Sequence, residues 1–153
     1  ALATVDPANR ATYAANAVRL QEELTTLERE ARSAFAAVPA TQRKVVSSHD
    51  AFAYFGRAYG IRFIAPVGVS TDAEPSAGEV AAIIRQIRRE KIPAIFVENI
   101  SDPRLLERIS RESGARIGGT LYSDSLSPPG TPGDSYLGMM RHNIRTLSAA
   151  LGH

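Results

Sequence analysis

The sequence contains no cysteine, which excludes disulfide bonds, thiolate metal sites and cysteine nucleophiles from these 153 residues. It also has no apolar run near the roughly 18 residues that a transmembrane helix requires. Hydrophobic residues make up 44% of the chain and charged residues 22%. This balance is typical of a folded domain with a packed core, and the length leaves room for one domain of ordinary size.

A strong excess of one charge sign is also missing, since the formal net charge is only +2. The densest basic cluster consists of Arg85, Arg88, Arg89 and Lys91, on a predicted helix. No aromatic residues are interleaved with it. A solvent-exposed helix face is therefore favoured over a nucleic-acid surface, and we expect no nucleic-acid partner.

The first 40 residues carry the pattern of one long helix, with Asp6 and Pro7 at its start and Pro39 after its end. Apolar residues alternate at spacings of three and four along one stripe, which comprises Tyr13, Ala17, Leu20, Leu24, Leu27, Ala31 and Phe35. About 32 helical residues would span roughly 48 Å, more than the roughly 38 Å diameter of a compact domain of this size. A coiled-coil strand is the structural alternative, although two alanines make a thin seam.

After residue 41 the chain alternates between strand and helix patterns. Strands are predicted at 44–48, 61–67, 93–97 and 116–122. Helices are predicted to begin at Asp50, Ser76, Asp102 and Asp134. This alternation favours right-handed crossovers between parallel strands. We therefore predict an α/β fold, a four-stranded parallel sheet flanked by helices and preceded by the long helix.

Three residues that could bind a cation follow three different predicted strands. His49 follows the first strand, Glu98 the third and Asp124 the fourth. Ligands of parallel sheets collect beyond the carboxyl ends of the strands, so we expect the three side chains to converge there. Glu98 directly follows an apolar strand, where an unpaired carboxylate is costly. Two carboxylates brought together would repel each other unless a cation lay between them.

Each of these residues also has a structural interpretation. A histidine at a strand end can be a satisfied polar residue, Asp124 can cap a turn, and Asp50 can cap the helix that follows it. As a set, one nitrogen and two oxygen donors suit a divalent first-row metal and disfavour copper(I) and closed structural zinc. Manganese is favoured, with zinc and iron(II) as alternatives. A fourth ligand would come from water, substrate or another segment.

Five segments, taken in order, resemble a known family. They are Ser-His-Asp-Ala-Phe-Ala-Tyr-Phe at 48–55, Ser-Thr-Asp-Ala-Glu-Pro-Ser at 70–76, Phe-Val-Glu-Asn at 96–99, Leu-Tyr-Ser-Asp-Ser-Leu at 121–126 and Gly-Asp-Ser-Tyr-Leu-Gly-Met-Met-Arg-His-Asn at 133–143. Together they resemble the metal-binding solute receptors of bacterial ABC importers for manganese, zinc and iron, the cluster A-I substrate-binding proteins. The resemblance extends over nearly the whole chain.

The resemblance implies two α/β lobes joined by a long rigid helix, with the metal between the lobes. Residues 1–40 would be that connector and residues 41–153 the C-terminal metal-binding lobe, with the N-terminal lobe absent. It also implies His49, Glu98 and Asp124 as metal ligands. Zinc-selective members commonly carry a histidine at or near the position of Glu98, and its lack here again favours manganese or iron.

The expected function is extracytoplasmic capture of a divalent metal, periplasmic or anchored at the cell surface, for delivery to an ABC permease. No enzymatic activity is expected. A metal-dependent hydrolase is the main alternative, disfavoured because no nucleophile, base or phosphate-binding loop accompanies the three residues. A surface adhesin of the same family is a third possibility.

Two further expectations concern the chain taken alone. Without the first lobe, its metal binding should be weaker than that of an intact receptor, because half of the cleft is missing. The stripe from Tyr13 to Leu24 would also lose part of its cover. We therefore expect either a homodimer through the helix at residues 7–30 or a disordered helix start.

Overall fold

The computed structural model describes residues 1–68 and 75–152. Its sheet has four parallel strands, β1 (Lys44–Val46), β2 (Arg62–Ile64), β3 (Ala94–Glu98) and β4 (Arg116–Leu121). The strands lie in the order β2-β1-β3-β4. The predicted four-stranded parallel α/β fold is therefore confirmed, with β1 and β2 shorter than the sequence indicated.

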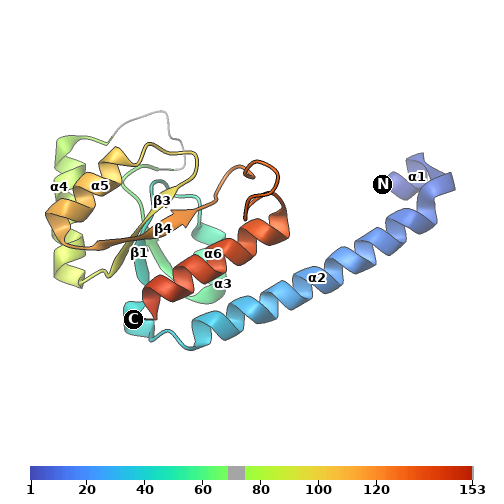
Figure 1. Ribbon diagram of the computed structural model, residues 1–153, viewed down its shortest axis with the longest axis horizontal. Helices are drawn as coiled ribbons and strands as arrows, with labels where there is room; N and C mark the ends of the chain where they lie inside the picture. Colours follow the sequence, from blue (N-terminus) through green and yellow to red (C-terminus); the bar gives the residue numbers. More distant parts are fainter. Residues whose placement is uncertain (69–74, 153) are drawn as a thin grey trace.

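Six helices accompany the sheet in the part of the chain that the structure describes. They are α1 (Leu2–Val5), α2 (Arg10–Ala36), α3 (Ala53–Tyr59), α4 (Ala77–Glu90), α5 (Arg104–Ser113) and α6 (Tyr136–Leu151). Helices α4 and α5 cover one face of the sheet, and α3, α6 and the end of α2 cover the other (Figure 1). None of the described helices combines the length and the apolar character needed to cross a bilayer.

Helix α4 forms as its local sequence predicts. The Ser76 hydroxyl accepts the backbone N–H of Glu79, and the Glu79 carboxylate accepts the backbone N–H of Ser76, which is the expected capping box. The apolar stripe of the helix is buried against the sheet, through Val80, Ile83, Ile84 and Ile87. Burial of these four side chains fixes α4 on the sheet and places its N-terminus at the edge where β1 and β3 end.

Three predicted helix starts were wrong. Helix α3 begins at Ala53 with Phe52 as its N-cap, so Asp50 does not cap it. Helix α6 is capped by Ser135, while the carboxylate of Asp134 accepts the backbone N–H of Gly130 instead. The third start was predicted at Asp102, but α5 begins at Arg104 and Pro103 occupies its N-cap position. The Asp102 carboxylate still accepts the backbone N–H of Arg104.

The long helix also starts later than predicted, at Arg10, after α1 and a short 3-10 turn at Pro7–Asn9. The carboxylate of Asp6 accepts hydrogen bonds from the side chains of Asn9 and Tyr13 and makes no backbone cap. Helix α2 therefore has 27 residues. At about 1.5 Å per residue it is roughly 40 Å long.

Only the last part of α2 packs on the α/β lobe. Leu27, Ala31 and Phe35 are buried, whereas Leu20 and Leu24 are 48% and 37% exposed. The helix therefore extends away from the lobe, with the N-terminus far from the sheet (Figure 1).

Polar contacts reinforce this joint between α2 and the lobe. The Arg43 guanidinium donates to the carbonyl oxygens of Phe35 (2.6 Å), Val38 (3.0 Å) and Tyr59 (3.3 Å), which ties the end of α2 to the end of α3. Arg141 on α6 forms an ion pair with Glu30.

The Tyr59 hydroxyl forms a further link, because it donates to the Glu28 carboxylate at 2.5 Å. Burial and this hydrogen bond raise the pKa of Tyr59 to about 12. The same bond lowers the pKa of Glu28 from its ordinary value. Both shifts favour the neutral phenol beside the charged carboxylate, which is the pairing that holds α2 against α3.

A bulge interrupts the pairing of β3 with β4. Ile95 pairs with Ile117, but the next residue, Phe96, pairs with Gly119, so Gly118 is an extra residue in β4. Gly119 has a φ of +136°, which favours glycine. The shift pairs Leu121 with Glu98. It therefore determines which residue of β4 lies beside Glu98 where the chain leaves the sheet.

Candidate metal site

His49 lies just beyond β1, where its backbone forms an isolated parallel bridge with Val67. The residue is only 2% exposed. The Ser47 hydroxyl donates to the His49 carbonyl at 3.0 Å. The imidazole is therefore held at the carboxyl edge of the sheet by the strand that precedes it.

Glu98 is the last residue of β3 and is 1% exposed. Its Oε1 accepts the backbone N–H of His49 at 3.0 Å, and its own N–H donates to the Ser48 hydroxyl at 3.2 Å. These bonds cross-link the ends of β1 and β3. The chain runs outward from β1 to β2 and from β3 to β4 in opposite directions, so this is the switch point of the sheet, where ligands of α/β proteins bind.

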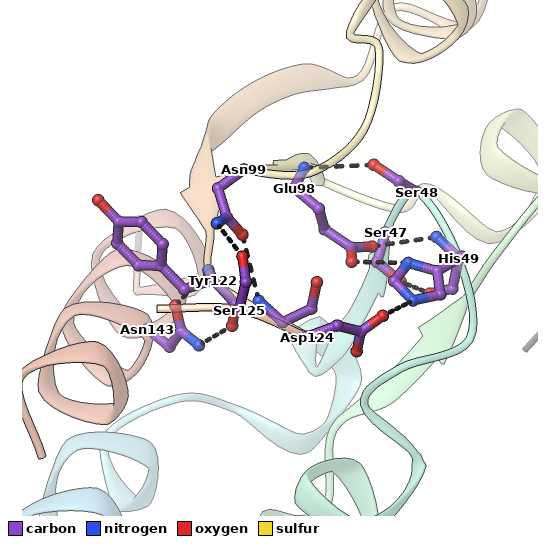
Figure 2. A network of polar contacts seen from close by, with 10 residues as sticks. Ser47, Ser48, His49, Glu98, Asn99, Tyr122, Asp124, Ser125 and Asn143 are labelled. Atoms are coloured by element: carbon purple, nitrogen blue, oxygen red, sulfur yellow. Dashed lines mark hydrogen bonds and ion pairs between the residues drawn. The ribbon is translucent and has the colours of Figure 1, made fainter. Parts of the chain in front are cut away.

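Asp124 lies on the loop after β4, and its side chain is 59% exposed. Its Oδ2 is 3.0 Å from His49 Nε2, while Glu98 Oε2 is 2.7 Å from His49 Nδ1. Figure 2 shows the imidazole between the two carboxylates. The structure thus brings the three predicted site residues together at one edge of the sheet.

Two of these atoms lack a hydrogen bond. His49 Nδ1 and Glu98 Oε2 are at ion-pair distance, but neither has a partner with hydrogen-bond geometry, and both are buried. Buried polar atoms are nearly always satisfied, and ligands of α/β proteins bind at switch points, so this pair is a candidate for binding a cation. One nitrogen and several carboxylate oxygens are donors that fit a divalent first-row cation.

The present arrangement does not yet surround a cation. Within the described ranges, no three histidine, cysteine or carboxylate side chains are placed to hold a metal ion together. The reason is geometric, because the two carboxylates contact opposite nitrogens of one ring. Ligation of a single cation by all three residues therefore stays a prediction.

A cavity of about 750 Å³ opens beside His49, between the first turns of α4 and α5. Ser48, Val67, Val80 and Leu105 are among the residues that line it. The edge of the sheet that carries the site is thus hollowed on one side. Residues 70–74 of the segment Ser-Thr-Asp-Ala-Glu-Pro-Ser lie outside the described residues.

Sequence reasoning gave no role to the residues that support the predicted ligands in the polar network of Figure 2. Ser47 and Ser48 support His49 and Glu98, and Asn99 and Asn143 contact the loop that carries Asp124. Ser48, Asn99 and Asn143 each belong to one of the segments that carried the family resemblance. Membership in those segments was the available signal for their roles.

Fold and donor set together define a parallel α/β lobe with a histidine–carboxylate cluster at its switch point. The family described as "Zinc-uptake complex component A periplasmic" (ZnuA) matches residues 1–150. The chain belongs to this family.

Curated relatives include the manganese ABC transporter substrate-binding lipoprotein PsaA of Streptococcus pneumoniae. It is 32% identical over 146 residues, which are 95% of this chain and 47% of the relative. The iron ABC transporter substrate-binding lipoprotein MtsA of Streptococcus pyogenes serotype M1 is 34% identical, with the same coverage of 95% and 47%. The chain thus spans about half the length of these relatives.

Solved structures of metal-binding proteins also resemble this chain over nearly its whole length. The periplasmic zinc binding protein TroA from Treponema pallidum superposes with a TM-score of 0.94 at 34% identity, over 99% of this chain and 57% of that chain. A manganese-bound mutant of a periplasmic metal binding protein from Candidatus Liberibacter asiaticus gives 0.89 at 27% identity, over 98% and 56%. The likeness covers α2 together with the lobe.

Proposed function

We propose that this chain is the connector helix and the C-terminal lobe of an extracytoplasmic receptor that captures a divalent transition metal for an ABC permease. The observation that carries the proposal is the buried His49 between Glu98 and Asp124 at the switch point. Relatives named for manganese and iron transport, and a neighbour named for zinc binding, support this class of cargo. The proposed role is binding and delivery, without an enzymatic step.

His49, Glu98 and Asp124 are the proposed ligands. The imidazole contacts both carboxylates, so a cation that binds all three must replace at least one ring–carboxylate contact. Loading therefore includes a side-chain rotation. Two carboxylates beside one imidazole favour manganese over zinc, with iron(II) close to manganese.

The proposed domain division follows the packing of α2. Residues 1–40 form the connector and residues 41–153 the metal-binding lobe of a two-lobe receptor. The match to about half of each relative supports this division. The first lobe would supply the remaining ligand and close the cleft over the metal, in the periplasm or at the cell surface.

Metal binding by the chain is expected to be detectable but weak. Three ligands at an open edge leave coordination positions to water, so the Kd for Mn²⁺ should be weaker than about 1 µM, which corresponds to about −8.2 kcal/mol. Titration calorimetry with Mn²⁺, Zn²⁺ and anaerobic Fe²⁺ measures this affinity, and metal analysis after dialysis gives the stoichiometry.

The matched variants are His49→Ala and His142→Ala. His142 lies on α6, where it bonds to the Thr120 carbonyl oxygen and packs against the Tyr122 ring, and it makes no hydrogen bond to the proposed ligands. Binding should be lost in the first variant and kept in the second. No binding of any of the three metals at millimolar concentration would refute the proposed function, and a submicromolar Kd would refute the need for a second lobe.

We also propose that the chain alone forms a homodimer through α2. Leu20 is 48% exposed and Leu24 is 37% exposed, and their spacing of four residues places them on the same side of the helix. Burial of a leucine side chain contributes about 1.5–3 kcal/mol, so pairing of these surfaces is favourable. Multi-angle light scattering should give twice the chain mass, and Leu20→Glu combined with Leu24→Glu should give the monomer. A monomeric wild type would contradict the proposal.

A further inference from the structure

Asn143 is a buried amide on α6 that bonds twice to the backbone of one residue. Its Oδ1 accepts the N–H of Tyr122 at 2.9 Å, and its Nδ2 donates to the Tyr122 carbonyl oxygen at 2.7 Å. Both polar atoms of the side chain are hydrogen-bonded, and the residue is 2% exposed. The two bonds are those that a neighbouring strand would make, and they hold the chain one residue beyond Leu121, where β4 ends.

Asn99 holds the next residues of the same segment. Its Oδ1 accepts the N–H of Ser123 at 3.4 Å, and its Nδ2 donates to the Ser125 hydroxyl at 3.2 Å. Its own backbone N–H donates to the Leu121 carbonyl oxygen at 3.0 Å. Asn99 directly follows Glu98 in the sequence, so this anchor is part of the site edge itself (Figure 2).

Asp124 lies between these anchored residues. Its side chain is largely exposed and reaches His49 Nε2 at 3.0 Å. A loop carboxylate with so little cover keeps such a contact only if its backbone is fixed, because its side chain gains little from packing. The neighbouring Ser123 Oγ is buried without a hydrogen-bond partner among the described residues, an unfavourable placement that other contacts must maintain.

We propose that Asn143 and Asn99 form an amide clamp, which fixes the backbone of residues 122–125 and thereby positions Asp124 for the cation before the cation arrives. The inference rests on the proposed function, in which Asp124 is a ligand. The clamp residues are positioning residues, since neither contacts the proposed ligand atoms. Loss of an outer partner that orients a metal ligand typically weakens metal affinity by about 10–100-fold.

Two variants open the clamp from opposite sides. Asn143→Asp keeps the size of the side chain and the acceptor for Tyr122 N–H, but places an oxygen against the Tyr122 carbonyl oxygen. Asn99→Ala removes both side-chain bonds at an exposed position, so this variant should fold even if the first does not. The controls are Ile144→Val, a buried change next to Asn143 on α6, and Asn9→Ala, a matched asparagine at the far end of α2.

Two readouts separate positioning from stability. The first is the Mn²⁺ Kd, measured well below the unfolding temperature of every variant. The second is amide hydrogen exchange of residues 122–125 in the metal-free chain. We expect about tenfold weaker Mn²⁺ binding in both clamp variants. We also expect faster exchange at Tyr122 in Asn143→Asp, because repulsion from the Tyr122 carbonyl oxygen pushes the new carboxylate away from Tyr122, and at Ser123 in Asn99→Ala, with no change in the controls.

Clamp variants that are less stable but retain the wild-type Kd and exchange rates would overturn the inference. Wild-type chain that binds no Mn²⁺ would overturn the proposed function instead. In that case, faster exchange in both clamp variants would still support the amide clamp, and unchanged exchange would overturn it as well.

Discussion

Replacement of Glu98 by glutamine is expected to weaken Mn²⁺ binding by at least about 100-fold, since the loss of a direct ligand should exceed the effect typical of outer partners. Glu98 supplies a buried negative charge within 2.7 Å of the imidazole. Glutamine removes this charge and one metal-binding oxygen but keeps the shape of the side chain. The effect should therefore appear in metal affinity and leave the fold intact.

The metal-free Glu98→Gln chain should be at least as stable as the wild type. The new amide oxygen can still accept the His49 backbone N–H, as Oε1 does now. Meanwhile a carboxylate with one orphaned oxygen no longer has to be buried. Under the proposed function, such a result would show that the wild-type site gives up stability for metal binding, as expected of a binding site and not of a structural ion pair.

Calorimetric titration with Mn²⁺ and thermal unfolding followed by circular dichroism test both halves of this prediction. Glu107→Gln is the matched control, since Glu107 is exposed on α5, away from the contacts of His49. Binding by Glu98→Gln within threefold of the wild type would exclude Glu98 as a ligand. A large loss of stability without metal would indicate that its role is structural.

Replacement of Gly118 by alanine should lower the free energy of unfolding by about 3 kcal/mol, the upper end of the usual cost of overpacking a core. A Cβ at this position would lie 2.7 Å and 2.8 Å from two ring atoms of Phe96 and 3.0 Å from the Ala150 Cβ. Phe96 is fully buried, so its ring has no free space to move into. The added methyl group must displace β4 or α6.

Urea denaturation followed by circular dichroism measures this loss, and Gly78→Ala provides a control of opposite sign. Gly78 lies in the first turn of α4 with only the Ser76 hydroxyl nearby, at 3.8 Å. Alanine there should be neutral or stabilising, by up to about 1 kcal/mol. The double variant Gly118→Ala with Phe96→Leu should lose less stability than the sum of its parts. Strict additivity would show that the ring contact is not the cause.

Local signals in the sequence were sufficient to predict most of the fold. The capping box at Ser76 and the stripe of α4 depend only on residues within one helix, and both were confirmed. The starts at Asp50 and Asp134 failed because nearby alternatives, Phe52 and Ser135, occupy the N-cap positions. The sequence patterns around Asp50 and Asp134 do not distinguish between neighbouring residues that could serve as the N-cap.

Convergence of the site residues followed from topology, because the carboxyl ends of parallel strands share one edge. The side of the imidazole that each carboxylate contacts depends on rotamers, which no sequence pattern specifies. The bulge at Gly118 and the bonds of Asn143 to Tyr122 depend on packing between β3, β4 and α6. Such contacts link residues 21 or more positions apart and are visible only in the folded chain.

The shallow anchorage of α2 has a mechanical consequence. Roughly 15 residues of this helix, from Arg10 to Leu24, project as a free arm of about 22 Å. A tilt of about 5° at the joint would displace the far end by about 2 Å, whereas metal–ligand distances tolerate only about 0.2 Å. The position of anything attached to the free part of α2 therefore depends on the contacts at its base. Those contacts are made by Arg43, Tyr59 and Arg141, which together fix the orientation of the helix.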